Sequence, residues 1–200
     1  MKIFSIQILF KDHSCGKTII LQSCHDLTQF GYFQKNSVKE FLEFTSKLVV
    51  ERTEKCQRSS VKEQEYLCHI YVRGDQLSGV LFSDEEYPNR VAQTILSKLL
   101  DEFAAEFPPQ KCLLMEENSA NFKRVAEFLQ KYQNPKEADP LMRLQNDLDE
   151  TKIILHNTLE QVLARGEKID DLVQRSEGLS AQSKMFYQTA KKTNRCCTIL

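Results

Sequence analysis

Residues 141–193 carry a single apolar stripe, spaced by alternating steps of three and four residues, and contain no proline. The spacing averages about 3.5 residues, the repeat of a left-handed coiled coil, and predicts a helix of roughly 80 Å. One helix cannot bury such a stripe, so the segment has to pack against other helices. The stripe has ten apolar residues, five hydroxyl residues and one arginine: Leu141, Leu144, Leu148, Thr151, Leu155, Thr158, Val162, Arg165, Ile169, Leu172, Ser176, Leu179, Ser183, Phe186, Ala190 and Thr193.

Arg165 is the one charged residue of the stripe. Its guanidinium has donors but no acceptor, so its burial requires acceptors from partner helices at the same level, which fixes the register of an assembly. In an ordinary dimer the arginine could instead extend into solvent, and the spacing alone does not decide between the two. The hydroxyl positions favour an assembly with other chains, because Thr151, Thr158, Ser176 and Ser183 would pack poorly against copies of themselves.

The residues before this segment alternate between strand-like and helix-like apolar runs. Strands are expected over residues 2–10, 17–23, 66–73 and 77–83, with an edge strand near residues 58–64. Helices are expected over residues 37–53, 88–107 and 119–132. This order predicts an α+β domain with a five-stranded antiparallel sheet and three helices, large enough to close its own core. The expected organisation is a domain over residues 1–132, a linker over 133–140, the coiled coil over 141–193 and a tail over 194–200.

The sequence indicates where the first expected helix starts and which of its faces packs inward. Ser37 and Glu40 have the spacing of a capping box. Helical periodicity then places six residues on one face, which is expected to pack on the sheet: Val38, Phe41, Leu42, Thr45, Leu48 and Val49.

Charge and composition exclude several classes of protein. The formal net charge is −1 and no lysine–arginine block is present, which argues against nucleic-acid binding. No stretch reaches the ~18 apolar residues needed to span a bilayer, and no cleavage site follows the N-terminal apolar run. The seven cysteines show no metal-ligand spacing, so we expect reduced thiols, no metal and no cofactor.

The stretch "VLARGEKIDDLV" (residues 162–173) resembles the R-SNARE motif, and the N-terminal region is similar to a longin domain, which has a profilin-like fold. The ending "NRCCTIL" resembles that of the prenylated longin R-SNAREs, which lack a transmembrane anchor. Together these resemblances cover essentially all 200 residues. They imply one helix of a four-helix bundle, completed by three glutamine-bearing helices, with Arg165 at the central ionic layer. The implied seam residues are Leu148, Leu155, Val162, Ile169, Leu172, Leu179 and Phe186.

The resemblance further implies a role in membrane fusion, in secretory, Golgi and endosomal–vacuolar transport. Such a chain would move between the cytosol and the cytoplasmic face of Golgi, vesicle and endosomal or vacuolar membranes, and the SNARE disassembly machinery would be a partner. In this family the coil folds back over the longin domain and shields the lipid in a groove beside the first helix. Phe41, Leu42 and Leu48 are the groove candidates, and ordinary core packing is the alternative.

The C-terminal residues predict covalent lipid rather than a bound cofactor. Cys197 begins a C-a-a-X prenylation signal, so a prenyltransferase would be a partner. One prenyl chain anchors only marginally, and Cys196 is the expected second lipid site, by palmitoylation or another lipid. The last residue favours geranylgeranyl by the general rule and the resemblance implies farnesyl, so the lipid stays open. No acidic residue occurs after Glu177, which makes the approach to this end basic: Lys184, Lys191, Lys192 and Arg195.

Three other functions fit parts of the sequence less well. "CGKT" suggests a small GTPase, but the strand expected after Thr18 stands where a phosphate loop needs a helix. A thiol enzyme would need a paired cysteine and histidine, whereas neighbours such as Cys68 and His69 point to opposite faces of a strand; self-palmitoylation is implied by the resemblance alone. A passive prenylated tether would tolerate replacement of Arg165 by leucine.

Overall fold

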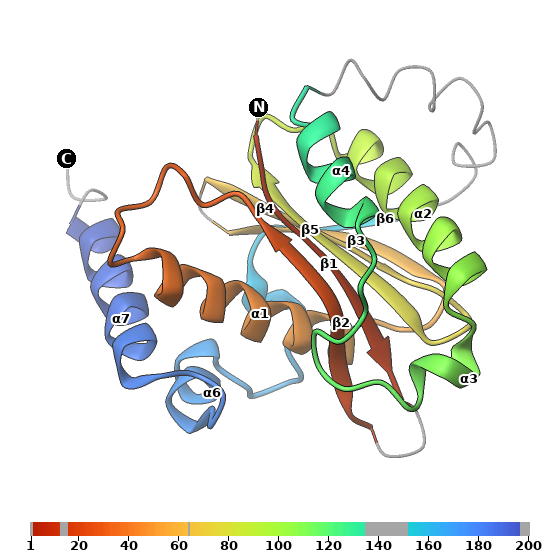
Figure 1. The fold of residues 1–200 in the computed structure, drawn as a ribbon. Coiled ribbons are helices and arrows are strands. Elements are labelled where there is room, and N and C mark those ends of the chain that lie inside the picture. Colours follow the sequence, from red (N-terminus) through yellow and green to blue (C-terminus); the bar gives the residue numbers. More distant parts are fainter. Residues whose placement is uncertain (1, 13–15, 64, 135–151, 197–200) are drawn as a thin grey trace.

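The computed structural model describes residues 2–12, 16–63, 65–134 and 152–196 (Figure 1). The five expected strands are present, pair antiparallel and lie in the order β2-β1-β5-β4-β3. The α+β fold class is therefore confirmed. The strands are β1 (Ile3–Lys11), β2 (Thr18–His25), β3 (Gln57–Glu63), β4 (Tyr66–Val72) and β5 (Leu77–Asp84).

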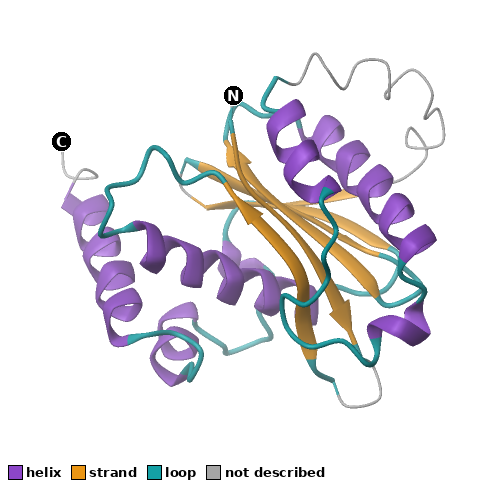
Figure 2. Cartoon of the chain, in the orientation of Figure 1, coloured by secondary structure: helices purple, strands orange, loops and turns teal. Residues whose placement is uncertain are grey.

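Helices cover both faces of this sheet (Figure 2). On one face, Ile6 and Ile8 of β1 share a buried cluster with residues of α2 and α4. On the other face, Leu9 and Val80 share a second cluster with residues of α1. Both faces of the central strands are thus apolar and covered, as in a three-layer domain. The helices are α1 (Lys35–Arg52), α2 (Asn89–Glu106), the short α3 (Pro109–Cys112) and α4 (Arg124–Lys131).

The start of α1 differs from the sequence prediction. The helix begins at Lys35, and its N-cap Gln34 makes no side-chain capping bond. The capping box of Ser37 and Glu40 is therefore wrong: Ser37 is buried inside the helix, and the Glu40 carboxylate accepts hydrogen bonds from the far end of the chain. The predicted inner face is confirmed, with four residues buried and two partly buried: Val38, Thr45, Leu48, Val49, Phe41 and Leu42.

Residues 152–196, which we call the C-terminal segment, do not form the single coiled-coil helix that the stripe predicts. They form β6 (Ile153–His156), the 3-10 turn η3 (Leu159–Gln161), α6 (Ile169–Arg175) and α7 (Ala181–Cys196). A turn over residues 164–167, in which Gly166 has φ +90°, separates η3 from α6. A lone helix would leave the apolar stripe in water. Here two stripe residues, Ile169 and Leu179, are instead buried against the N-terminal domain.

Strand β6 also changes the sheet. It pairs parallel with β3, so β3 is an inner strand rather than the edge strand expected from sequence. An unpaired edge exposes backbone donors and acceptors that another strand can satisfy. Among the described helices, none is long and apolar enough to cross a bilayer.

Candidate functional site: the interface between the C-terminal segment and the N-terminal domain

Apolar side chains of the C-terminal segment complete the second buried cluster of the domain. Four of them are at most 8% exposed, and they come from η3, α6 and the approach to α7: Leu159, Ile169, Val173 and Leu179. Four more are partly buried against the same cluster: Val162, Leu163, Leu172 and Tyr187. Full burial of such a side chain stabilises by about 1.5–3 kcal/mol as an upper estimate, which exceeds the ~1 kcal/mol of a single hydrogen bond. Apolar burial is therefore the main contribution to this interface.

Strand β6 aligns the start of the segment with the sheet. Its register runs from Arg58 opposite Ile153 to Val61 opposite His156. Just beyond it, the Leu159 backbone N–H donates to the Glu63 carboxylate at 3.1 Å. These contacts position Leu159 above the cluster that it enters.

An ion pair holds the turn at residues 164–167. Arg52, at the end of α1, donates from Nε and Nη2 to the two carboxylate oxygens of Glu167, at 3.0 and 2.6 Å. Glu167 also accepts from the Ala164 backbone N–H at 2.9 Å, which closes the turn. The hydrogen bonds from Arg52 foremost, and then that from Ala164, lower the pKa of Glu167. Arg165 lies in this turn and is exposed.

Glu40 of α1 binds the start of α7. Its carboxylate accepts from the Ser180 backbone N–H at 3.0 Å and from the Ser183 hydroxyl at 2.7 Å. Ser183, one of the small stripe residues, is fully buried. Burial of Glu40 opposes its ionisation, but the hydrogen bonds from Ser183 and Ser180 outweigh that effect and lower the pKa of Glu40. The charged carboxylate therefore acts as a cap for the first turn of α7.

An aromatic contact joins α1 to the middle of α7. The rings of Phe41 and Tyr187 stack with centroids 5.3 Å apart and an interplanar angle of 22°. The Tyr187 hydroxyl donates to Asp170 of α6 at 2.8 Å, and Lys191 forms an ion pair with the same carboxylate. Burial foremost, and then the hydrogen bond to Asp170, raises the pKa of Tyr187. Phe41 thus faces the C-terminal segment.

The predicted seam residues are divided by this arrangement. Ile169 and Leu179 are buried, and Val162, Leu172 and Phe186 are partly buried, whereas Leu155 is 63% exposed. Leu148 and Cys197 lie outside the described residues, and Cys196 is the last residue of α7. The roles assigned to these residues in a bundle, and to Arg165, stay predictions.

The groove candidates differ among themselves. Leu48 is 7% exposed and belongs to the core, whereas Phe41 and Leu42 are partly buried beside the C-terminal segment. A lipid-binding role for these residues stays a prediction.

Sequence reasoning missed several residues of the interface. Leu159 and Val173 each lie one position after a stripe residue, and Ile169, Leu172 and Val173 have the spacing of an amphipathic helix on their own. That pattern is readable in the sequence. No pattern in the sequence indicated that Arg52 and Glu40 bind the C-terminal segment, because the residues that they contact lie more than a hundred positions away.

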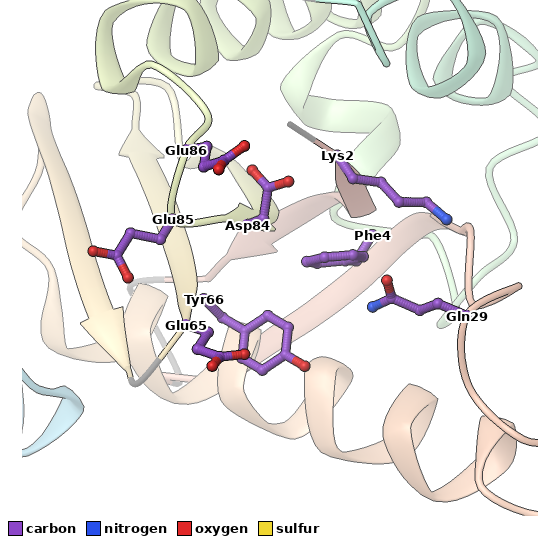
Figure 3. A pocket seen from close by; sticks show the side chains of 8 residues that line it. All are labelled: Lys2, Phe4, Gln29, Glu65, Tyr66, Asp84, Glu85 and Glu86. Carbon is purple, nitrogen blue, oxygen red and sulfur yellow. The ribbon is translucent and has the colours of Figure 1, made fainter.

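A hollow of about 850 Å³ lies beside the sheet, where β4 and β5 approach the start of β1 (Figure 3). Phe4 and Tyr66 lie next to each other in it, with centroids 5.4 Å apart. Carboxylates line it: Glu65, Asp84, Glu85 and Glu86. Within the described residues, no three His, Cys, Asp or Glu side chains are grouped to hold a metal.

The two enzyme alternatives find no support in the fold. Strand β2 begins at Thr18, where a phosphate loop would require a helix. Cys68 belongs to the second buried cluster, while both ring nitrogens of His69 bond serine hydroxyls, Ser60 at 2.9 Å and Ser83 at 3.1 Å. Burial raises the pKa of Cys68 and lowers that of His69 to about 3, so neither side chain is charged at neutral pH.

Comparisons with known proteins agree with the fold of the N-terminal domain. A model described as a regulated-SNARE-like longin domain matches residues 27–136, and a synaptobrevin model matches residues 140–199. "Synaptobrevin homolog ykt6" of Schizosaccharomyces pombe is 49% identical over 100% of both chains, and "Synaptobrevin homolog YKT6" of Eremothecium gossypii is 48% identical over 100% of both. The protein of that name from Saccharomyces cerevisiae is 46% identical over 92% of this chain and 93% of its own.

The fold and these comparisons together define the class of the protein, which is a SNARE with an N-terminal longin domain. The chain belongs to the synaptobrevin family of longin-type R-SNAREs, a family of vesicle-transport SNAREs rather than of enzymes.

Replacing Glu40 should loosen α7. Glu40→Ala removes the acceptor of Ser180 and Ser183, which should cost about 1–2 kcal/mol of the free energy that holds α7 on the domain. The form in which α7 has left the domain should then become roughly 5–30-fold more populated. Trypsin cleavage after Arg175 and Lys184 should accelerate by that factor, because it requires local opening. Glu106→Ala, at an exposed site on α2, is the control and should change nothing. Equal cleavage of both variants would contradict the role of Glu40.

The same contact should depend on pH in the acid range. Since the pKa of Glu40 is lower when docked than when free, its stabilisation is present at neutral pH and is lost as pH falls below the ordinary value of about 4.3. The amide NMR signals of Ser180 and Ser183 should therefore titrate with a midpoint below the pKa of an ordinary glutamate. Glu40→Gln should abolish that transition, and a wild-type midpoint above the ordinary value would refute the contact.

Proposed function

We propose that this chain contributes one helix to a four-helix bundle with three glutamine-bearing SNARE helices, and that this assembly drives membrane docking and fusion. The support is the unbroken stripe over residues 141–193, with Arg165 at its one ionic position. Family membership supports the same role. In the bundle the segment would be continuous helix, and the acceptors for Arg165 would come from the partner glutamines.

The proposal includes regulation by the longin domain. The observation that carries it is that Ile169 and Leu179, which belong to the stripe, are buried against the domain. One apolar side chain cannot be buried in two places, so docking on the domain and assembly with partners exclude each other. The domain then acts as an internal competitor that keeps the unassembled chain closed.

The division of the chain in this proposal is a longin domain over residues 1–132, a linker over 133–140, the SNARE motif over 141–193 and a lipidated tail over 194–200. Cys197 is the prenylation site and Cys196 the second lipid site, with a prenyltransferase and the SNARE disassembly machinery as partners. A prenyl chain would lie beside α1 near Phe41 and Leu42, which retain exposed surface, rather than at Leu48, which the core occupies. The chain would shuttle between the cytosol and Golgi, vesicle and endosomal–vacuolar membranes.

Assembly with partner helices is the direct test. Phe41→Glu places a charge in the stack on Tyr187, so it should speed formation of a heat-resistant four-chain complex by roughly tenfold or more. The thermal stability of the finished complex should not change, because Phe41 lies outside the bundle. Gln110→Glu adds the same charge at an exposed site on α3 and is the control. Near-UV circular dichroism of the free protein checks that the domain remains folded.

Arg165→Leu is the complementary arm of that experiment. Because Arg165 is exposed in the turn, the substitution should leave the closed chain and its opening unchanged. It should instead alter partner choice or disassembly, since the opposing glutamines lose their donor. A passive tether would tolerate it without effect. Failure of the wild-type chain to assemble with any glutamine-bearing helices would reject the bundle, and equal rates for wild type and Phe41→Glu would reject the regulation.

Removal of the prenylation site should release the protein from membranes. Cys197→Ser should leave the chain in the unbound fraction, and Cys196→Ser should allow only brief attachment, because stable anchoring takes two signals. Sedimentation with membranes measures both, with Cys56→Ser at an exposed cysteine as the control. Stable sedimentation of the Cys197→Ser protein would show that the anchor lies elsewhere.

A further inference from the structure

The turn between η3 and α6 depends on one glycine. Among the described residues of the C-terminal segment, Gly166 alone has a positive φ, at +90°. The Glu167 backbone N–H donates to the Ala164 carbonyl at 2.9 Å, so residues 164–167 form a β-turn with Arg165 and Gly166 at its centre. The φ of Arg165 is negative, and this order of signs is that of a type II turn. The third residue of such a turn is usually glycine, because other side chains are strained there.

The turn is held in place on the domain from both of its sides. Arg52 of α1 binds the Glu167 carboxylate through two hydrogen bonds. Leu159 precedes the turn and Ile169 follows it, and both enter the second buried cluster. The conformation of Gly166 therefore sets how η3 and α6 are placed on the same cluster.

Gly166 is required for its backbone conformation and not for close packing. Among the described residues, no atom beyond its two chain neighbours lies within 4 Å of the position that a Cβ would take. A methyl group at this position would meet no obstacle. Replacement by alanine therefore changes the conformational preference of the backbone and leaves every contact of the interface in place.

The same residue has the opposite effect on a continuous helix. Residue 166 lies inside the stripe segment 141–193, which would be helical throughout in the proposed bundle. Glycine is among the poorest residues in a helix interior, whereas alanine is the best. Residue 166 follows the stripe residue Arg165 and lies off the stripe, so a methyl group there would not enter the seam.

We propose that Gly166 is a positioning residue that selects between the docked segment and the assembled helix. It stabilises the docked segment, because it adopts the left-handed turn without strain, and it weakens the continuous helix that partner SNARE helices would bind. Both effects hold the unassembled chain closed. The second effect rests on the four-helix function proposed above, and the first concerns the single chain alone.

Hydrogen exchange of the free full-length protein tests the first effect. Gly166→Ala should accelerate exchange in β6, α6 and α7 by roughly tenfold, since a left-handed conformation is costly for alanine. Exchange in β1 and β5 should not change. Gly166→Asn should have a smaller effect, because asparagine tolerates a positive φ better than alanine does.

Two other glycines supply matched controls. Gly178 lies in the same segment without a positive φ, and a Cβ on it would meet only an ordinary contact with Ser176, at 3.8 Å. Gly16 has φ +69° and open space around it, but it lies in the hairpin between β1 and β2. Neither Gly178→Ala nor Gly16→Ala should accelerate exchange in the C-terminal segment.

Assembly with glutamine-bearing SNARE helices tests the second effect. Gly166→Ala should form the four-chain complex roughly tenfold faster and should raise its unfolding temperature, because alanine favours helix. Gly178→Ala should raise that temperature without faster assembly. A residue with a merely structural role would lower the stability of both states.

Unchanged exchange in Gly166→Ala, acceleration matched by Gly178→Ala or Gly16→Ala, or a lower unfolding temperature of the Gly166→Ala complex would overturn the proposal. Failure of every variant to assemble would reject the four-helix function and, with it, the second effect. The exchange experiment contains no partner chains, so its result would still decide the role of Gly166 in the closed chain.

Discussion

The apolar stripe of the C-terminal segment needs a surface to cover it, and most of the structure depends on that requirement. In the single chain the surface is the cluster between α1 and the sheet, where the stripe residues Ile169 and Leu179 are buried together with Leu159 and Val173, which lie next to the stripe. The domain would expose part of its own core if the segment left. Each half of the chain therefore stabilises the other, and under the proposed function partner helices that bind the stripe would first have to displace it from the domain.

Polar contacts determine where the segment lies rather than how strongly it is held. The carboxylates of Glu40 and Glu167 each accept several hydrogen bonds across or beside the interface, and β6 aligns with β3. A single contact of this kind is worth about 1 kcal/mol, so each can be lost without unfolding the domain. An interface assembled from several small contacts around an apolar centre can open while the rest of the fold persists.

The strands and helices of the N-terminal domain could be predicted from the sequence because the apolar periodicity of each segment fits only one kind of element there. Strands β1 to β5 and helices α1, α2 and α4 all follow from local periodicity and turn residues. The C-terminal segment was predicted as one helix because the stripe describes its packing against other helices. The turn at Gly166, strand β6 and the contacts of Glu40 depend on the surface of this particular domain, which no local pattern encodes. Exposed Leu155 shows the same thing, since the stripe alone would bury it. The spacing left the exposure of Arg165 undecided, and the turn on this domain exposes it.

The central claim is that the N-terminal domain holds the C-terminal segment in the unassembled chain. Hydrogen exchange of residues 153–192 in the full-length protein, compared with the same residues in a peptide covering 135–200, measures this directly. The account predicts slow exchange in β6, α6 and α7 of the full-length protein and fast exchange throughout the peptide. Equal rates in the two samples would contradict it, because the segment would then gain nothing from the domain.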